Sequence, residues 1–119
     1  DISYGFTGED EPQAPEGYPY QACIYGAARI KEQVSVPVFA VNSIVTPQMA
    51  EEILQTQKVD MVDLCRAVMV DNNWVNDARA GRSTGMCRRC SPCGLRVKGG
   101  VCAGKVLLER ERAKEEQTC

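Results

Sequence analysis

The sequence Val36-Pro37-Val38-Phe39-Ala40-Val41 is the clearest indication of fold class in this chain. It is a continuous apolar run between polar and turn-forming residues, which is typical of a strand buried on both faces of a parallel sheet. Pro37 stands at the entry of the predicted strand, where a missing N–H is tolerated. The run therefore predicts an α/β protein.

Helices are predicted on both sides of this strand. Residues 22–34 carry apolar side chains at near-helical spacing with charged residues between them, which predicts a helix. Thr46 is a typical N-cap and Pro47 a typical first helical residue, so a second helix is predicted from there to Leu54.

The second half of the chain continues the alternation. Residues 60–65 predict another short strand, and residues 73–80 predict a helix that carries the only tryptophan. The charged segment 105–117 is a further helix candidate, in which Arg112 and Glu116 are spaced for an i,i+4 ion pair on a solvated face.

Alternating strands and helices with short links are the βα repeat of a parallel α/β fold. A strand-like segment at residues 1–6 and a proline-rich loop at residues 8–19 precede the repeat. A closed (β/α)8 barrel takes eight strands and about 250 residues, whereas this chain has 119 and does not open with Met. We therefore expect a fragment or one piece of a larger assembly, completed by another chain or by a missing segment, because parallel sheets need covered faces and protected edges.

Composition narrows the class of protein further. The chain is 44% hydrophobic and 25% charged with a net charge of −2, which argues against a nucleic-acid binder. It contains no apolar run long enough for a membrane span, and we expect a reducing, cytoplasmic location. It also contains no histidine, so any proton transfer within the chain falls to other side chains, and the catalytic residues are unknown.

Four cysteines, Cys87, Cys90, Cys93 and Cys102, are spaced C-x2-C-x2-C-x8-C. Thiolates at this spacing on a glycine-containing loop converge on one point, as a tetrahedral metal or an iron–sulfur cluster requires. Spacing alone does not separate zinc from a cluster. Two disulfides are the alternative, which a reducing compartment disfavours.

The whole pattern resembles a known family. The resemblance runs from residue 34 to residue 93 and is carried by Val36–Asn42, Thr46-Pro47, Ala50–Leu54, Val59–Val62, Arg66 and Ala78–Arg82 ahead of the cysteines. The family is the iron–sulfur branch of the old yellow enzyme superfamily, which includes bacterial 2,4-dienoyl-CoA reductase, trimethylamine dehydrogenase and related NADH:flavin oxidoreductases.

This resemblance implies a partial (β/α)8 (TIM) barrel. Residues 1–82 would form the C-terminal part of a flavin-binding barrel, about strands six to eight with their helices. Residues 83–119 would form a Cys-rich loop that binds a [4Fe–4S] cluster beside FMN, followed by a charged C-terminal helix. The family commonly spaces its cysteines C-x2-C-x3-C-x11-C, so this loop is shorter in two places, and zinc stays open as the alternative.

The resemblance also implies an FMN phosphate site in the loops after strands seven and eight, a common phosphate site of such barrels. The residues at these positions are Asn42, Ser43, Cys65 and Arg66. Arg66 matches one of the family's phosphate-binding arginines, whose paired donors suit phosphate oxygens. Ser43 replaces the other and brings no charge. Cys65 is also expected, with Cys23, to pack in the core as a small apolar residue.

Two functions follow from these expectations. The first is an oxidoreductase component whose [4Fe–4S] cluster relays electrons to or from FMN. The second is a degenerate accessory subunit with a structural zinc or cluster site and no turnover. An independent zinc-binding module is a third possibility, which the truncated sheet disfavours. The tyrosines, Tyr4, Tyr18, Tyr20 and Tyr25, are expected to pack and not to transfer protons.

Overall fold

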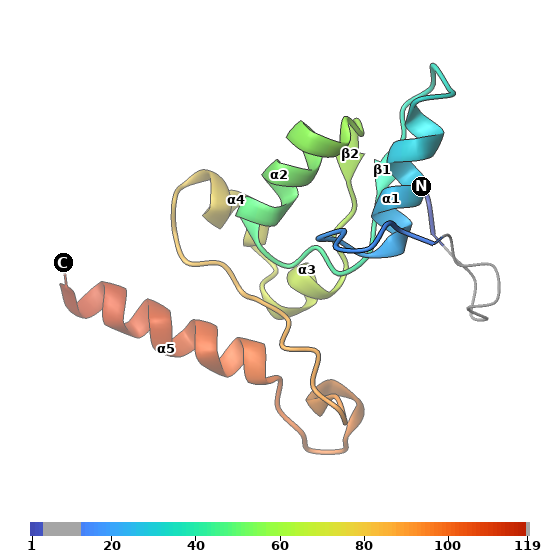
Figure 1. Cartoon of the computed structure of the whole chain (residues 1–119). Helices are drawn as coiled ribbons and strands as arrows, with labels where there is room; N and C mark the ends of the chain where they lie inside the picture. Colours follow the sequence, from blue (N-terminus) through green and yellow to red (C-terminus); the bar gives the residue numbers. More distant parts are fainter. Residues whose placement is uncertain (4–12, 119) are drawn as a thin grey trace. The chain divides into compact units, whose positions relative to one another are not determined.

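A computed structural model of the chain describes residues 1–3 and 13–118 (Figure 1). The chain divides into two compact units. The first comprises Asp1–Ile44 and Gln48–Leu64, and the second comprises Val45–Pro47 and Cys65–Cys119. No helix in the described ranges is long and apolar enough to cross a membrane.

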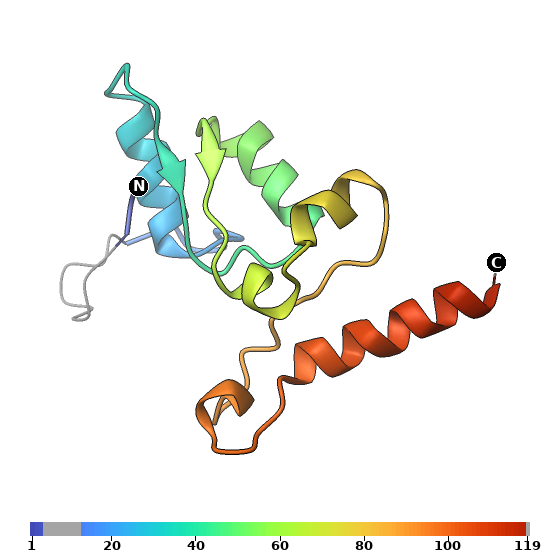
Figure 2. The same ribbon diagram turned by 180° about the vertical axis from the view of Figure 1, so that it is seen from behind.

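The first unit is a βα repeat. Its elements are α1 (Ala22–Lys31), β1 (Phe39–Ala40), α2 (Pro47–Gln57) and β2 (Met61–Val62). The strands pair in parallel, with Phe39 opposite Met61 and Ala40 opposite Val62. Both views show the two strands side by side between α1 and α2 (Figures 1 and 2). The predicted parallel α/β arrangement is therefore confirmed for this part of the chain.

A third segment lies beside β1. Ile2 forms an isolated parallel bridge with Ala40, and its N–H donates to the carbonyl of Phe39 at 3.2 Å. This supports the start of the strand predicted at residues 1–6. The rest of that strand, the first part of the predicted loop and Tyr4 lie outside the described residues.

The strands are shorter than predicted. The expectation that the apolar run is buried throughout is wrong at its entry, because Val36 is 60% exposed whereas Val38 and Ala40 are 3% and 0% exposed. The predicted strand at 60–65 is likewise reduced to Met61–Val62. In the described part of the chain the sheet has two strands, and single hydrogen bonds from the N–H groups of Asp60 and Asp63 to the carbonyls of Val38 and Ala40 flank the paired residues.

The helices of this unit follow the sequence signals closely. Pro47 is the first residue of α2, as predicted. Ile53 of α2 and Ile24 of α1 are both fully buried. Helix α1 ends earlier than predicted. Its last turn tightens through a hydrogen bond from the Gln33 N–H to the Ile30 carbonyl at 2.9 Å, an i→i+3 bond that closes the helix.

The second unit contains α3 (Arg66–Val70), α4 (Trp74–Arg79), the 3₁₀ turn η2 (Gly94–Arg96) and α5 (Ala103–Thr118). Helices α4 and α5 confirm the predictions at 73–80 and 105–117. Helix α3 was not predicted, and the expectation of a loop at Arg66 and the following residue is wrong. A long irregular segment, orange in Figure 1, joins α4 to α5 and carries the four cysteines.

Candidate functional site

The four cysteines of the C-x2-C-x2-C-x8-C segment line one cavity in the second unit. The cavity measures about 390 Å³. The other residues along its wall come from α3, from the cysteine loop and from the start of α5. The structure thus brings the four thiols to one cavity, and their prediction as ligands of one centre stays a prediction.

All four thiols are free, and three are partly buried while Cys90 is exposed. Within the described ranges, no three Cys, Asp or Glu side chains lie close enough together to hold one metal ion. The donor set itself suits zinc or an iron–sulfur cluster, since both accept four thiolates. The thiols therefore line the cavity without adopting ligand geometry.

Glycines allow the loop between Cys93 and Cys102 to close on itself. A Cβ on Gly94 would collide with the backbone of Val101, and one on Gly100 would collide with the carbonyl of Gly94. The Gly100 N–H also donates to the Val97 carbonyl at 2.8 Å. The backbone of Gly94, next to the third cysteine, therefore lies directly against that of Val101, next to the fourth, and neither Gly94 nor Gly100 has room for a side chain.

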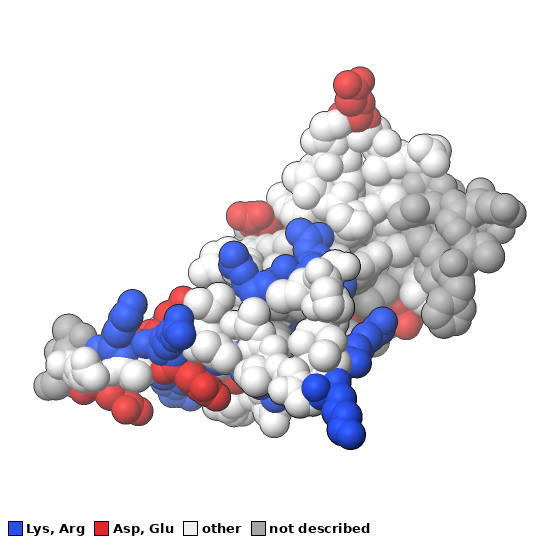
Figure 3. Space-filling view, turned by 90° about the horizontal axis from the view of Figure 1, so that it is seen from below, with Lys and Arg blue, Asp and Glu red and all other residues white. Residues whose placement is uncertain are grey.

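The cavity is also strongly basic. Arg66, Arg88, Arg89 and Arg96 line it, and residues 78–108 contain seven Lys and Arg residues but no Asp or Glu. Lys and Arg side chains are prominent on the face drawn in Figure 3. Four metal-bound thiolates carry more negative charge than a zinc ion or an oxidised cluster core neutralises, so these guanidinium groups favour a thiolate centre electrostatically.

A buried carboxylate network lies at the base of the cysteine loop. Asp71 and Asp77 are 4% and 2% exposed. Arg112 of α5 donates from Nη2 to Asp71 Oδ2 at 3.0 Å and also contacts Asp77 Oδ2. The prediction that Arg112 belongs to a solvated face is therefore wrong, since it bridges two buried acids far away in the sequence.

Asp77 is stabilised in its charged form. Arg82 donates from Nε to Asp77 Oδ1 at 2.9 Å, and Asn73 donates from Nδ2 to the same oxygen at 2.7 Å. The Arg82 hydrogen bond is the largest cause that holds the pKa of Asp77 below its usual value, with help from Asn73 and against the opposing effect of burial. Asp77 is therefore ionised at neutral pH.

The predicted flavin residues of the first unit form a sharp turn after β1. Asn42 and Ser43 have φ angles of 100° and 56°, a left-handed conformation that is uncommon for residues other than glycine. Ser43 Oγ donates to Asn42 Oδ1 at 3.0 Å, and Asn42 Nδ2 lies 3.7 Å from Cys23 Sγ. Strained backbone of this kind is concentrated at functional sites. Cys23 is 3% exposed, which confirms it as a core residue.

The predicted flavin residues of the second unit lie at the start of α3. Cys65 is exposed, so its prediction as a core residue is wrong: it occupies the N-cap position of a short surface helix. Arg66 lines the same cavity as the four cysteines. A phosphate site shared by Asn42, Ser43, Cys65 and Arg66 stays a prediction.

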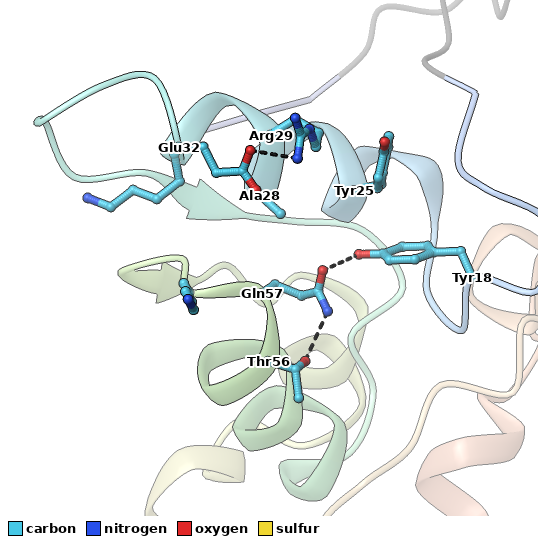
Figure 4. Close-up of a pocket in the computed structure, with 9 residues that line it drawn as sticks. Tyr18, Tyr25, Ala28, Arg29, Glu32, Thr56 and Gln57 are labelled. Atoms are coloured by element: carbon cyan, nitrogen blue, oxygen red, sulfur yellow. Dashed lines mark hydrogen bonds and ion pairs between the residues drawn. The ribbon is translucent and has the colours of Figure 1, made fainter.

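A second cavity, of about 540 Å³, lies in the first unit between α1 and the end of α2 (Figure 4). Tyr18 donates its hydroxyl to Gln57 Oε1 at 2.7 Å, and its ring makes edge contacts with Tyr20 and Tyr25. Burial, with smaller effects of the two neighbouring tyrosines, raises the pKa of Tyr18 to about 12. These rings pack as predicted, and Tyr18 stays protonated at neutral pH.

Comparison with known proteins places the geometry in context. Residues 14–85 match the NADH:flavin oxidoreductase / NADH oxidase family. The match ends two residues before Cys87, so the cysteine loop lies outside it. No solved structure matches the chain significantly.

Three curated relatives have reductase or oxidase names. A metal reductase of Desulforamulus reducens is 37% identical over 77% of this chain and 14% of its own length. An NADH oxidase of Thermoanaerobacter brockii is 34% identical over 65% of this chain and 12% of its own length. A bilirubin reductase of Mediterraneibacter gnavus is 38% identical over 55% of this chain and 10% of its own length. The chain thus spans a small part of each relative.

Proposed function

The chain belongs to the NADH:flavin oxidoreductase / NADH oxidase family, and we propose that it is part of an FMN-dependent oxidoreductase whose cysteine loop holds a [4Fe–4S] cluster. The observation that carries the proposal is the shared cavity, which all four thiols line together with four arginines. When bound, the flavin supplies the redox chemistry at the substrate and the cluster exchanges single electrons.

The chain contributes ligands, closure and charge to this site. Cys87, Cys90, Cys93 and Cys102 are the proposed cluster ligands. The close backbone approach of Gly94 to Val101 keeps together the segments that carry the third and fourth proposed ligands. The surrounding guanidinium groups offset the negative charge of four thiolates, which lowers the cost of placing that charge in a partly buried cavity.

The proposed FMN phosphate residues are those that the family resemblance assigns to the two turns after the strands. Arg66 would donate paired hydrogen bonds to the FMN phosphate, and Ser43 would donate one. Asn42 and Cys65 would contribute from the same two turns. Because Arg66 also lines the thiol cavity, the proposal places one guanidinium group beside both cofactors.

The remaining strands of the barrel must come from elsewhere. The family has a (β/α)8 barrel fold, and the two paired strands with a third bridged segment are consistent with part of one. We propose that another segment or chain completes the sheet and supplies the contacts to the flavin ring.

Anaerobic purification followed by metal and sulfide analysis tests the proposal. Iron with matching acid-labile sulfide, and a broad visible absorption that disappears when any one of the four cysteines is changed to serine, is the expected result. Cys65→Ser is the matched control for iron and sulfide content alone, because Cys65 is exposed and lies outside the proposed cluster ligands. Iron retained in full by all four single variants would refute the ligand assignment.

A structural zinc site in a non-catalytic subunit is the second candidate. Two features favour it. The cysteine loop is shorter than is common in the family, and Ser43 replaces an arginine that would bring a positive charge to the phosphate. The same analysis separates the two: zinc without sulfide supports the structural site, whereas iron with sulfide supports the cluster.

A further inference from the structure

The two ends of the cysteine loop meet at a single carboxylate. Asp71 Oδ2 accepts a hydrogen bond from the Gly85 N–H at 3.1 Å, two residues before the first cysteine. The same oxygen accepts from Arg112 Nη2 at 3.0 Å, and Arg112 lies on α5, which begins directly after Cys102. One buried side chain of the second unit therefore binds the chain both before and after the four thiols.

Close packing supports this junction on the apolar side. A Cβ on Gly85 would lie 2.7 Å from Val70 Cγ1, and a Cβ on Gly104 would lie 3.0 Å from the same atom and 2.5 Å from the Met86 carbonyl oxygen. Both glycines are buried. Gly85 before the loop and Gly104 after it thus both pack against Val70 of α3, and neither position has room for a side chain.

We propose that Arg112 is a positioning residue for the thiol centre, which it serves by holding the base of the cysteine loop closed through Asp71 and Asp77. The inference rests on the proposed metal centre, but the closure itself does not. Fixing both ends of a loop reduces the conformations that its thiols can adopt before a metal binds, so less entropy is lost on binding.

No other cation of the network can replace Arg112. Arg82 contacts Asp77 alone, and its side chain is 55% exposed, whereas Arg112 reaches both acids and also donates to the Ser83 carbonyl at 3.3 Å. Removal of Arg112 would leave two buried carboxylates near each other with one counter-ion. Their repulsion would favour opening of the junction.

Anaerobic titration of the full chain with Co²⁺, followed by the visible bands of tetrahedral cobalt–thiolate, tests the role. Arg112→Gln is expected to weaken Co²⁺ binding about 10- to 100-fold, as for other residues that support metal ligands. Arg112→Lys should recover part of the affinity that Arg112→Gln loses, because the single nitrogen Nη2 contacts both carboxylates and an ammonium group keeps that charge and donor. Arg110→Gln, an exposed position on the same helix, should bind Co²⁺ like the parent.

Amide hydrogen exchange of the metal-free chain separates the closure from the centre. Arg112→Gln is expected to speed exchange of the Gly85 N–H while leaving α1 and α2 unchanged. If the parent chain binds no metal, the proposed metal centre is wrong. If, in addition, the Gly85 N–H of Arg112→Gln exchanges at the same rate as in the parent, the closure of the loop by Arg112 is wrong as well. If Arg112→Gln lowers only the unfolding midpoint and leaves Co²⁺ affinity and spectrum intact, the positioning role is wrong.

Discussion

Replacement of Gly85 by alanine is the sharpest test of the packing at the base of the cysteine loop. The new methyl group would lie 2.7 Å from both Asp71 Cβ and Val70 Cγ1, and 3.3 Å from Leu108 Cδ2. Asp71 cannot retreat easily, because its carboxylate is held by Arg112 and by the N–H groups of Gly85 and Asn73. Overpacking of this kind costs about 1–3 kcal/mol.

The fluorescence of Trp74 reports the loss of stability of this unit directly. It is the only tryptophan, it is 4% exposed, and it belongs to the same unit as Gly85. Each kcal/mol lowers the melting temperature of a domain this small by roughly 4–8 °C, so we expect the fluorescence transition of Gly85→Ala to fall by roughly 4–24 °C. Gly81→Ala is the control, because its φ of 68° makes alanine strained but no atom lies within 4 Å of the new Cβ.

A double-mutant cycle identifies the cause. Val70→Ala removes one of the two closest neighbours of the new methyl group, so its effect should be less than additive with Gly85→Ala, with a coupling of at least about 0.5 kcal/mol. With Gly81→Ala it should be additive. Additivity in both pairs, or an unchanged transition for Gly85→Ala alone, would refute the packing argument.

Three further outcomes are expected. In an assembly that holds the complete barrel, Arg66→Ala should weaken FMN binding by about one to two decades, the loss of a charge-assisted hydrogen bond of about 1.5–3 kcal/mol; unchanged FMN content would remove Arg66 from the phosphate site. Because the folded-state pKa of Asp77 is lowered, its stabilisation is present above the unfolded value of about 3.9 and is lost as the pH falls below it. The urea midpoint followed at Trp74 should therefore drop in that range, and Asp77→Asn should flatten the profile; a parent profile that is already flat there would contradict the assignment. The isolated chain should self-associate in sedimentation experiments, since Val36 and Met61 beside the open sheet are 60% and 49% exposed; a monomer at all concentrations would show that the sheet needs no further cover.

The elements that the sequence predicts well are those with strong local signals. Pro47 fixes the start of α2, and the apolar runs around Phe39 and Met61 give the parallel pair. Helix α3 is not predicted, because its five residues are too few to establish a helical period. The length of β1 is not predicted correctly for another reason. An apolar run shows which residues could be buried, whereas the extent of a strand depends on the neighbours with which it pairs.

The candidate site shows the same division. Cysteine spacing is a local property, and the four thiols it groups together line one cavity. Helical spacing predicts an i,i+4 pair between Arg112 and Glu116, yet the partners of Arg112 in the structure, Asp71 and Asp77, lie 41 and 35 residues away. Nothing in the local sequence of α5 distinguishes that arginine from its exposed neighbours. Contacts of this kind come from tertiary packing, which the spacing of residues along one helix does not encode.

The position of Asp71 bears on whether the cysteine loop is an independent module. The family match ends at Gly85, the residue that donates to Asp71, so this carboxylate belongs to the flavin-family segment. Arg112, its other partner, lies beyond that segment. An independent zinc module would supply its own closing contacts, but here both ends of the loop close on Asp71 and on Val70 of α3. Contacts that close the base of the cysteine loop therefore come in part from the segment that matches the flavin family, which argues against an independent module.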